Sequence, residues 1–303
     1  MSENSKKSTV LVVGATGFLG TEICRQLIAT GKNVIALVRN SSDPAKLNFL
    51  QQLGVETREG DLKNTTSIKK AIEGVQTIIS TASSTLSRQE GDSIESVDYN
   101  GQINLIRTAK DSGVNQFVFI SFCPMSQQFP LQTAKRKVES ELKESKMNYT
   151  ILQAGFFMEV WLGPAVGFDF PNSKATIYGE GNNKINWISL QDVAAITVAS
   201  VDNDTFGNSV FQLGGPEALS PLEVVGIFEK YSGNLFELQH VPVTALKDQK
   251  NSATDSLSES FAALMLIYAA GDDIDMSETR KVYPFRLTSV ADYVQRVIIK
   301  HEV

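Results

Sequence analysis

The sequence predicts an α/β protein with a doubly wound parallel sheet and a smaller C-terminal lobe. The first half of the 303 residues alternates short apolar, β-branched runs with segments of helical periodicity. This order is typical of parallel strands joined by crossover helices. A glycine-rich loop, GATGFLG, separates the first apolar run from the first helical segment. The alternation loosens after residue 154, and the length leaves room for a second, smaller lobe.

Six strands are expected before residue 155. The first, residues 9–13, is apolar along nearly its whole length, as a strand covered on both faces should be. The others are residues 33–38, 55–61, 75–80, 116–121 and 149–154. Each pair is separated by enough residues for a helix, and right-handed crossovers then give a doubly wound sheet. The first helix should place Ile23, Leu27 and Ile28 on one face and end at Gly31.

The second half offers fewer clear elements. Residues 174–189 contain two strand-like segments joined by a polar turn with glycines, and residues 209–215 form a further strand. Residues 189–201 and 289–300 have helical periodicity. Ser220, Pro221 and Glu223 form a capping box with proline at the first helical position, and this helix should close at Gly233. Some strands of this half are expected to return to the main sheet.

The composition excludes several classes of protein. Hydrophobic residues make up 42% and charged residues 20%, which argues against extended disorder. A net charge of −6 gives no electrostatic reason to expect a nucleic-acid partner. The longest apolar stretch, residues 261–270, is too short to cross a bilayer, so no membrane partner is expected. Cys24 and Cys123 suggest no disulfide framework, and we therefore expect a soluble, cytoplasmic protein.

The remaining charged and histidine positions point to no second site. The densest basic run, AKRK at residues 134–137, is followed by VESELKE, and this pattern favours a solvated helix face over a phosphate-binding patch. His240 and His301 are too isolated for a metal site or a catalytic triad. No metal site is expected.

The glycine loop predicts a dinucleotide site. GATGFLG follows a strand and opens a helix, which is the context that the Rossmann motif requires. Glycines permit a sharp turn and close approach of the backbone to a pyrophosphate, whose charge the N–H groups at the helix N-terminus receive. The alternative is a tight turn without a ligand. Because strand, loop, helix and second strand follow in order, we favour the dinucleotide.

Two further positions bear on which dinucleotide binds. Arg39 lies where NAD-specific folds often have an acidic residue, and no acid is nearby in VRNSS. A guanidinium can pair with a 2′-phosphate, which favours NADP, whereas the alternative is a plain surface arginine. In GDL, Asp61 can accept a hydrogen bond from the adenine amino group while Leu62 covers the ring. The alternative role of Asp61 is to cap the following helix.

These motifs together resemble a known family. GATGFLG, VRN, EGDL and TAKRKVESELKESKMNYTILQAGFFME look like the atypical short-chain dehydrogenases (SDR) of the NmrA-like and isoflavone-reductase-like group. LTSVADYVQRV is similar to the closing helix of NmrA-like proteins. The resemblance spans nearly the whole chain and is strongest before Glu159. It implies an NAD(P)-binding Rossmann domain over residues 1–154 and a smaller substrate-binding lobe over residues 155–303.

The resemblance also implies the cofactor-binding positions. The glycine loop would line the pyrophosphate, VRN the 2′-phosphate and GDL the adenine. The segment after the fourth strand would pass under the nicotinamide ribose, and the segment after the sixth would lie beside the nicotinamide. The positions are Gly14, Thr16, Gly17, Phe18, Leu19, Gly20, Arg39, Asn40, Asp61, Leu62, Thr81, Ala82, Ser83, Lys135, Gly155 and Phe156.

Lys135 is the catalytic candidate. The sequence departs from the family pattern at the position four residues before it. Lys135 matches the active-site lysine, but Leu131 fills the slot where typical short-chain dehydrogenases have a tyrosine four residues earlier. Residues four apart lie on one helix face, so both would face the nicotinamide. Leu131 excludes the ordinary tyrosine mechanism without excluding catalysis. The alternative role of Lys135 is an exposed helix ion pair with Glu139.

Substrate-contacting candidates are less specific. Cys123 follows the fifth strand, although a small buried residue is the better interpretation. Tyr178 can replace the missing phenol, whereas a strand tyrosine more often serves packing. The aromatic residues Phe156, Phe157, Trp161, Phe168 and Phe170 suggest a pocket wall, and core packing explains them equally well.

Three hypotheses about function remain. The preferred one is an NADPH-dependent reductase that transfers hydride to a carbonyl, imine or activated double bond of a mainly apolar small molecule, with Lys135 orienting the ribose and helping to protonate the product. The second is a redox sensor that binds NADP(H) without turnover and signals to a protein partner. The third is an epimerase or dehydratase with tightly held cofactor, which the absent tyrosine disfavours.

Overall fold

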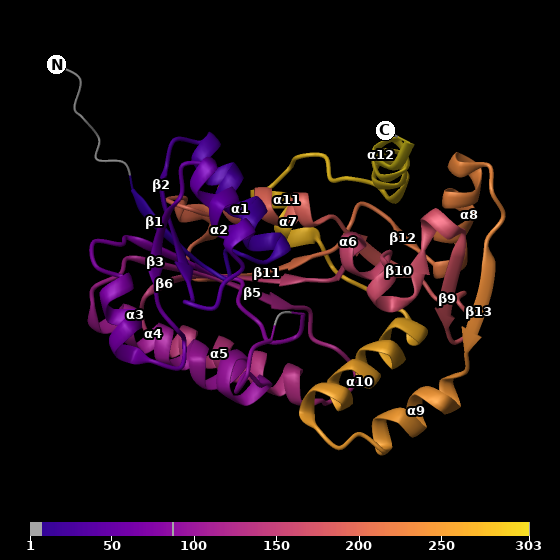
Figure 1. Cartoon of the computed structure of the whole chain (residues 1–303), viewed down its shortest axis with the longest axis horizontal. Helices are drawn as coiled ribbons and strands as arrows, with labels where there is room; N and C mark the ends of the chain where they lie inside the picture. Colours follow the sequence, from indigo (N-terminus) through magenta and orange to yellow (C-terminus); the bar gives the residue numbers. More distant parts are fainter. Residues whose placement is uncertain (1–7, 87, 303) are drawn as a thin grey trace. The chain divides into compact units, whose positions relative to one another are not determined.

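The chain divides into two compact units. The computed structural model describes residues 8–86 and 88–302 (Figure 1). Unit 1 contains the chain up to Ser121, Thr133–Leu152 and Ala194–Val210. Unit 2 contains Phe122–Gln132, Gln153–Val193 and the chain from Phe211 onward.

A seven-stranded sheet forms the frame of the fold. Its order is β11-β6-β5-β4-β1-β2-β3. The strands are β1 (Thr9–Val13), β2 (Asn33–Val38), β3 (Glu56–Glu59), β4 (Thr77–Ser80), β5 (Gln116–Phe122), β6 (Asn148–Ala154) and β11 (Ser209–Leu213). The pairs β1–β2, β1–β4, β2–β3 and β4–β5 are parallel. The predicted doubly wound sheet is confirmed, and β11 brings one strand of the second half into it.

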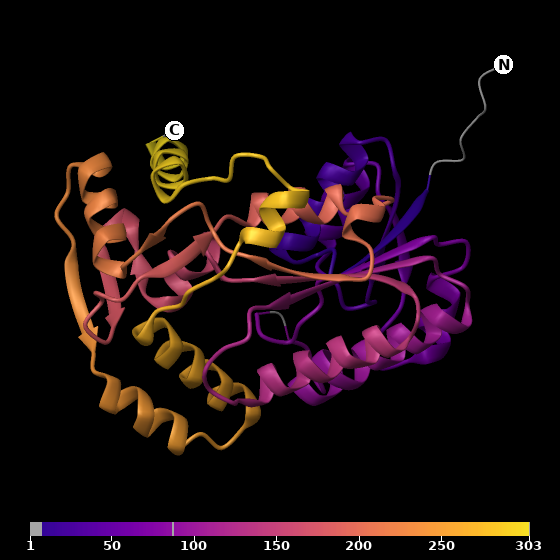
Figure 2. The same cartoon turned by 180° about the vertical axis from the view of Figure 1, so that it is seen from behind.

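Helices cover both faces of this sheet. Figures 1 and 2 show α1 (Phe18–Ala29) and α2 (Pro44–Gln52) on one face. The opposite face carries α3 (Thr65–Ala71), α4 (Gln102–Asp111) and α5 (Pro130–Glu144). A π-helical segment, η1 (Ile94–Gly101), leads directly into α4. Two more elements that contribute to unit 1 are α7 (Leu190–Ala199) and the short η4 (Asp204–Phe206).

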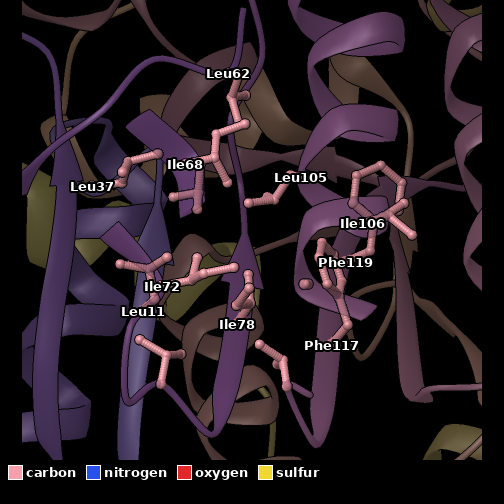
Figure 3. Packing of buried hydrophobic residues seen from close by; sticks show 14 of the residues in the cluster. Leu11, Leu37, Leu62, Ile68, Ile72, Ile78, Leu105, Ile106, Phe117 and Phe119 are labelled. Carbon is pink, nitrogen blue, oxygen red and sulfur yellow. The ribbon is translucent and has the colours of Figure 1, made fainter. Parts of the chain in front are cut away.

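The main core of unit 1 lies between the sheet and α3 and α4 (Figure 3). Leu11, Ile78 and Phe117 come from three neighbouring strands and are completely buried. Ile68 of α3 and Leu105 of α4 meet them in the same cluster and are equally buried. Burying a side chain of this size contributes roughly 1.5–3 kcal/mol. The continuous apolar runs predicted as strands therefore form the part of the fold that supports the loops at the strand ends.

Unit 2 contains two small sheets. One has the order β12-β10-β7, with β12 (Ala218–Leu219), β10 (Ile185–Ile188) and β7 (Phe156–Phe157). The other has the order β13-β9-β8, with β13 (Glu237–Val241), β9 (Lys174–Tyr178) and β8 (Phe168–Asp169). The two strands predicted within residues 174–189 are β9 and β10, and they belong to different sheets. Gly179 and Gly181 have positive φ angles of 75° and 76° in the connection, where the chain changes direction.

The helices of unit 2 include the one predicted from its cap. They are α6 (Met158–Trp161), α8 (Pro221–Ser232), α9 (Val243–Asn251), α10 (Ser256–Ala270), α11 (Ser277–Val282) and α12 (Val290–Glu302), with short 3-10 turns η2 (Pro164–Val166) and η3 (Phe170–Asn172). Ser220 and Glu223 make both hydrogen bonds of the capping box of α8, and Gly233 ends the helix at φ 74°. Among the described residues, no helix combines the length and apolar character needed to cross a membrane.

Candidate functional site

The glycine loop is a tight turn that lies against the loop after β4. Gly14 has a φ of +85°, and the Gly17 N–H donates to its carbonyl over 3.0 Å. A Cβ on Gly14 would lie 2.6 Å from Thr81 Oγ1 and 2.9 Å from Ala82 N. The sequence order of the sheet reverses between β1 and β4, and open α/β sheets bind ligands at such a switch point.

Gly20 brings the first helix onto the same loop. A Cβ at this position would lie only 2.2 Å from the Gly14 carbonyl oxygen, so no side chain fits. Gly17, the N-cap of α1, is exposed, and Phe18 is 74% exposed. Thr16 and Leu19 are half-buried. The first-turn N–H groups of α1 therefore have no side-chain cap and can receive an anion.

Arg39 takes part in a charge cluster that the sequence did not reveal. Its Nη1 lies 2.6 Å from Asp92 Oδ2, and Lys63 Nζ lies 2.5 Å from the other oxygen. Asp92 has a side chain that is only 1% exposed. Burial acts to raise the pKa of Asp92, but the hydrogen bonds from Lys63 and Arg39 outweigh it and hold the pKa below its usual range. Asn40, the next residue, is exposed.

Asp61 is not a helix cap. The N-cap of α3 is Asn64, whose side chain accepts from the Ser67 N–H. Asp61 Oδ1 accepts from the Lys63 N–H over 2.8 Å, and its Oδ2 lies 3.8 Å from Lys63 Nζ. The Leu62 side chain is 7% exposed and belongs to the main core. Asp61 thus lies in the same charge cluster as Arg39, whereas the Leu62 side chain packs inward.

The loop after β4 links the glycine turn to a buried carboxylate. The Thr81 N–H and hydroxyl both donate to the Val13 carbonyl, over 2.9 Å and 3.1 Å. Ala82 and Ser83 follow and are half-buried. Ser84 is buried and donates to Asp98 Oδ2 from both its N–H, over 3.0 Å, and its hydroxyl, over 2.6 Å. The three predicted positions therefore connect the loops at the ends of β1 and β4.

Lys135 is a buried lysine. It is 5% exposed, and its Nζ lies 3.4 Å from the Ile120 carbonyl, 4.0 Å from Asp98 Oδ1 and 4.9 Å from the centre of the Phe119 ring. Burial lowers the pKa of Lys135, and the charge of Asp98 opposes that effect. The alternative of an exposed pair with Glu139 is wrong, because Glu139 is itself buried and pairs with Arg136 over 3.1 Å.

Leu131 lies one turn before Lys135 on α5. Its side chain is 5% exposed, and its N–H donates to Ser260 Oγ over 3.1 Å. The position that holds a tyrosine in ordinary short-chain dehydrogenases thus carries a buried aliphatic group. The sequence analysis did not identify Asp98. The sequence does show a carboxylate within the helical segment that follows the fourth strand, and this was the available signal.

The remaining predicted positions belong to unit 2. Gly155 follows β6, and a Cβ there would lie 2.5 Å from Ile274 Cδ1. Phe156 is buried, with its ring edge-on to Trp161 at 4.7 Å between centres. Phe157 is half-buried in β7. Cys123 is buried and its thiol donates to the Gln153 carbonyl over 3.0 Å, as expected of a small core residue.

The aromatic residues divide into two clusters. Trp161 stacks on Tyr268 at 5.6 Å, and Tyr178 meets the same ring edge-on at 5.4 Å. A separate group forms around Phe228, with Phe168 at 4.8 Å and Phe170 at 5.8 Å. The five aromatic residues that are close in sequence therefore do not form one wall.

Tyr178 also lines a cavity of about 590 Å³ in unit 2. Phe261 and Met265 of α10 and Val241 of β13 contribute apolar surface, and Gln249 contributes an amide. The Tyr178 hydroxyl donates to the Val166 carbonyl over 3.0 Å, and burial raises the pKa of this phenol. Among the described residues that line the cavity, none is charged.

Two observations concern metal binding. Within the described part of the chain, no group of three or more His, Cys, Asp or Glu side chains is placed to hold a metal ion. His240 Nδ1 lies 3.0 Å from the Gly179 carbonyl, and the His301 side chain lies outside the described part.

The family model described as NmrA-like matches residues 6–294. The chain belongs to the NmrA-like family. A photosystem II assembly factor of Synechocystis is 32% identical over 78% of this chain and 72% of its own length. An isoflavone reductase homolog of Zea mays is 28% identical over 97% of this chain and 99% of its own.

A solved structure shares the fold of this chain. An NADPH-dependent quinone oxidoreductase of Escherichia coli, crystallised with NADPH, has a TM-score of 0.77 and 23% identity. The match covers 95% of the NmrA-like chain and 99% of the oxidoreductase. The family and fold expected from the sequence are confirmed, and proteins similar to this chain include NAD(P)H-dependent oxidoreductases.

Proposed function

We propose that this NmrA-like chain is an NADPH-dependent reductase that transfers hydride to a carbonyl, imine or activated double bond of a mainly apolar small molecule. The observation that carries the proposal is the burial of Lys135 in the same unit as the glycine loop. Burying an ammonium costs free energy unless the group is paired or hydrogen-bonded. A lysine without a function would therefore be expected at the surface rather than buried beside a carboxylate.

The residues present fit a dinucleotide. No Cβ fits at Gly14 or Gly20, because the turn, α1 and the loop after β4 pack closely against one another there. The N–H groups of the first turn of α1 have no side-chain cap and can receive a pyrophosphate. The pyrophosphate would lie on the glycine loop, from Gly14 to Gly20, and the adenine beside Asp61. Arg39 would meet the 2′-phosphate, with Asn40 next to it and Lys63 as a second cation. Thr81, Ala82 and Ser83 would pass under the nicotinamide ribose.

Lys135 would be the group that handles the proton. When bound, the cofactor supplies the hydride. Lys135 would hold the ribose hydroxyls and donate a proton to the reduced atom, because Leu131 offers no phenol. A lysine whose pKa is lowered by burial gives up a proton more readily than one in water.

The substrate would be bound by the C-terminal lobe, residues 155–303. Gly155 and Phe156 would line the nicotinamide, and Cys123, Phe157, Trp161 and Tyr178 are the proposed substrate contacts. Tyr178 is supported by its place in a cavity without charged walls, which suits an uncharged molecule. Cys123 has the least support, because its thiol is engaged with Gln153.

A second candidate function is a cofactor-binding protein without turnover. The similarity to an assembly factor at 32% identity favours it, because that name describes assembly of a protein complex rather than a reduction. Such a protein would keep the dinucleotide site and would have no need of a reactive lysine. The two candidates therefore differ in what Lys135 does.

The first experiment measures loss of NADPH absorbance with a panel of quinones and α,β-unsaturated ketones. We expect turnover with one class, and a decrease in kcat of about 100-fold or more in Lys135→Met, because the proton donor is removed. Lys143→Ala, an exposed lysine on the same helix, is the control and should be unchanged.

Calorimetric titration with NADPH accompanies the kinetics. NADPH binding with no turnover on any member of the panel would move the second candidate ahead. Equal rates in Lys135→Met and the native protein would exclude Lys135 as the proton donor.

A further inference from the structure

Asp98 is completely buried, and its two carboxylate oxygens have different surroundings. Oδ2 accepts both hydrogen bonds from Ser84, at 3.0 Å and 2.6 Å. Oδ1 has no hydrogen-bond partner in the described part of the chain. The nearest cation to it is Lys135 Nζ at 4.0 Å. One oxygen is therefore held in place, and the other faces the ammonium.

We propose that Asp98 is a positioning residue, which holds the Lys135 ammonium at the site through its charge and leaves the donors of that ammonium for a ligand. The proposal rests on the proposed function, because it concerns the lysine assigned there as proton donor. Asp98 itself would not contact the cofactor, since it is 0% exposed.

The separation of 4.0 Å between the two groups is the basis of this role. It is too long for a hydrogen bond, so no Lys135 donor is used on Asp98. It is short enough for a strong attraction, because opposite charges interact more strongly in the interior than in water. The Ile120 carbonyl, at 3.4 Å, is the one acceptor found for Lys135 Nζ among the described residues. An ammonium has three donors, so two are left for hydroxyl or carbonyl oxygens.

Ser84 keeps the carboxylate from closing this gap. Its N–H and hydroxyl both hold Oδ2, and it follows directly after the loop residues Thr81, Ala82 and Ser83. Asp98 comes from η1, whose π-helical winding begins at a capping box made by Ser93 and Ser96. Single π-helical turns inside helices occur frequently at functional sites. The Asp98 carboxylate is thus held by the loop after β4, which would pass under the nicotinamide ribose in the proposed function.

The other charged groups around Lys135 do not replace Asp98. Glu139 and Arg136 are on the same helix as Lys135, and they pair with each other over 3.1 Å. Asp98, by contrast, forms its one ion pair among the described residues with Lys135. The charges of Asp98 and then Glu139 raise the pKa of Lys135, against the larger effect of burial and a smaller one of Arg136.

The test is a titration of Lys135 by NMR on the full chain with ¹³Cε-labelled lysine. The Lys135 signal is assigned by its disappearance in Lys135→Arg. We expect Asp98→Asn to lower the pKa of Lys135 by about one unit or more, because an opposite charge at this distance is lost. Glu139→Gln is the matched control, and it should lower the pKa of Lys135 by less, since Glu139 is shared with Arg136.

Two outcomes would overturn the role of Asp98. One is a pKa of Lys135 that is the same in Asp98→Asn and the native protein. The other is a larger shift in Glu139→Gln than in Asp98→Asn. Ser84→Ala retains both charges and removes the shorter of the two hydrogen bonds to Asp98 Oδ2, so the pKa of Lys135 should not fall as it does in Asp98→Asn. Should Asp98→Asn fail to fold, Asp98→Ser takes its place, because it also removes the charge, and a pKa of Lys135 equal to that of the native protein contradicts the proposal.

The pH profile of NADPH oxidation separates this proposal from the proposed function. In Asp98→Asn the alkaline limb of kcat, where Lys135 loses its proton, should move to lower pH by the shift that NMR reports. If the pKa of Lys135 shifts in Asp98→Asn but the native protein has no turnover, the positioning role of Asp98 is supported and the reductase function is excluded. If the native protein has turnover but the alkaline limb of kcat does not move in Asp98→Asn, the reductase function is supported and the positioning role of Asp98 is excluded.

Discussion

The backbone around the glycine loop limits which side chains fit at its individual positions. The three glycines of GATGFLG do not have equivalent roles. Gly14 needs its positive φ, Gly20 needs the space that a Cβ would fill, and Gly17 has an ordinary φ of −84°. A Cβ at Gly17 would lie 3.3 Å from the Gly14 carbonyl oxygen, a less severe contact than at Gly14 or Gly20, and the pattern of letters alone does not reveal this difference.

Gly20→Ala tests this limit. The new Cβ would lie 2.2 Å from a backbone oxygen, so the helix must shift, and we expect the free energy of unfolding to fall by more than about 2 kcal/mol. Gly226→Ala in α8 is the control, because nothing lies within 4 Å of its Cβ position. That control should raise stability by about 0.5–1 kcal/mol. Urea unfolding measures both, and equal effects would contradict the packing seen at Gly20.

Elements are joined at their ends by a few polar side chains. Asp272 follows the end of α10 and accepts the Asn186 N–H of β10 over 2.6 Å. The Asn186 side chain in turn accepts the Ile274 N–H over 3.2 Å. Burial raises the pKa of Asp272 to about 6, more than its hydrogen bond from Asn186 lowers it. This connection between helix and strand is therefore sensitive to pH.

The raised pKa of Asp272 predicts a pH dependence of stability. The folded protein keeps a proton up to about pH 6, whereas the unfolded chain loses it near 3.8, so this contribution is present at acidic pH and lost as the pH rises through 6. Asp272→Asn should gain about 1–3 kcal/mol over the native protein on going from pH 4.5 to pH 7.5. Chemical unfolding at several pH values measures the difference.

Asp275→Asn is a control in which the pH dependence of stability should have the opposite sign. Hydrogen bonds from Ser277 lower the pKa of Asp275, so its charge favours the folded state at neutral pH. This substitution should weaken the protein at pH 7.5 and have less effect at acidic pH. A gain for Asp272→Asn that is the same at every pH would show that the carboxyl does not titrate in this range.

At the scale of the whole molecule, the sheet order decides which loops meet. β4 pairs with β1 on one side and with β5 on the other. The loop after β4 therefore lies beside the glycine turn and also holds Asp98, which faces Lys135 on the helix after β5. A ligand that engages these loops would bind the folded chain and not the unfolded one, and it would stabilise the whole fold.

Thermal unfolding with cofactor tests this expectation. NADPH at about 100 times its Kd should stabilise the protein by about 2.7 kcal/mol, and NADH at the same concentration should stabilise it less. Arg39→Ala should remove most of the difference, because the contact to the 2′-phosphate is lost. Lys110→Ala, an exposed cation at the end of α4, should keep it. Equal stabilisation of the native protein by both cofactors would contradict the assignment of Arg39.

Much of the fold could be predicted because its signals are local. The strand runs, the glycine turn and the capping box at Ser220 depend on neighbours within a few residues, and each was found near its expected place. Burial was harder to predict. Lys135 lies in KRKVESELKE, a run rich in charged residues, yet it is buried, and its Nζ lies 4.0 Å from Asp98 Oδ1 of another element. The pairing of Arg39 with Asp92, and the presence of Lys63, were missed for the same reason.

The sequence by itself determined the fold class, the family and the position of the glycine turn, because hydrophobic periodicity and glycine conformation are properties of short segments. Only the tertiary structure decided that Lys135 is enclosed beside Asp98, that Arg39 shares a carboxylate with Lys63, and that β9 and β10 belong to different sheets. Each of these depends on segments far apart in the chain, which come together only when the strands take their order in the sheets.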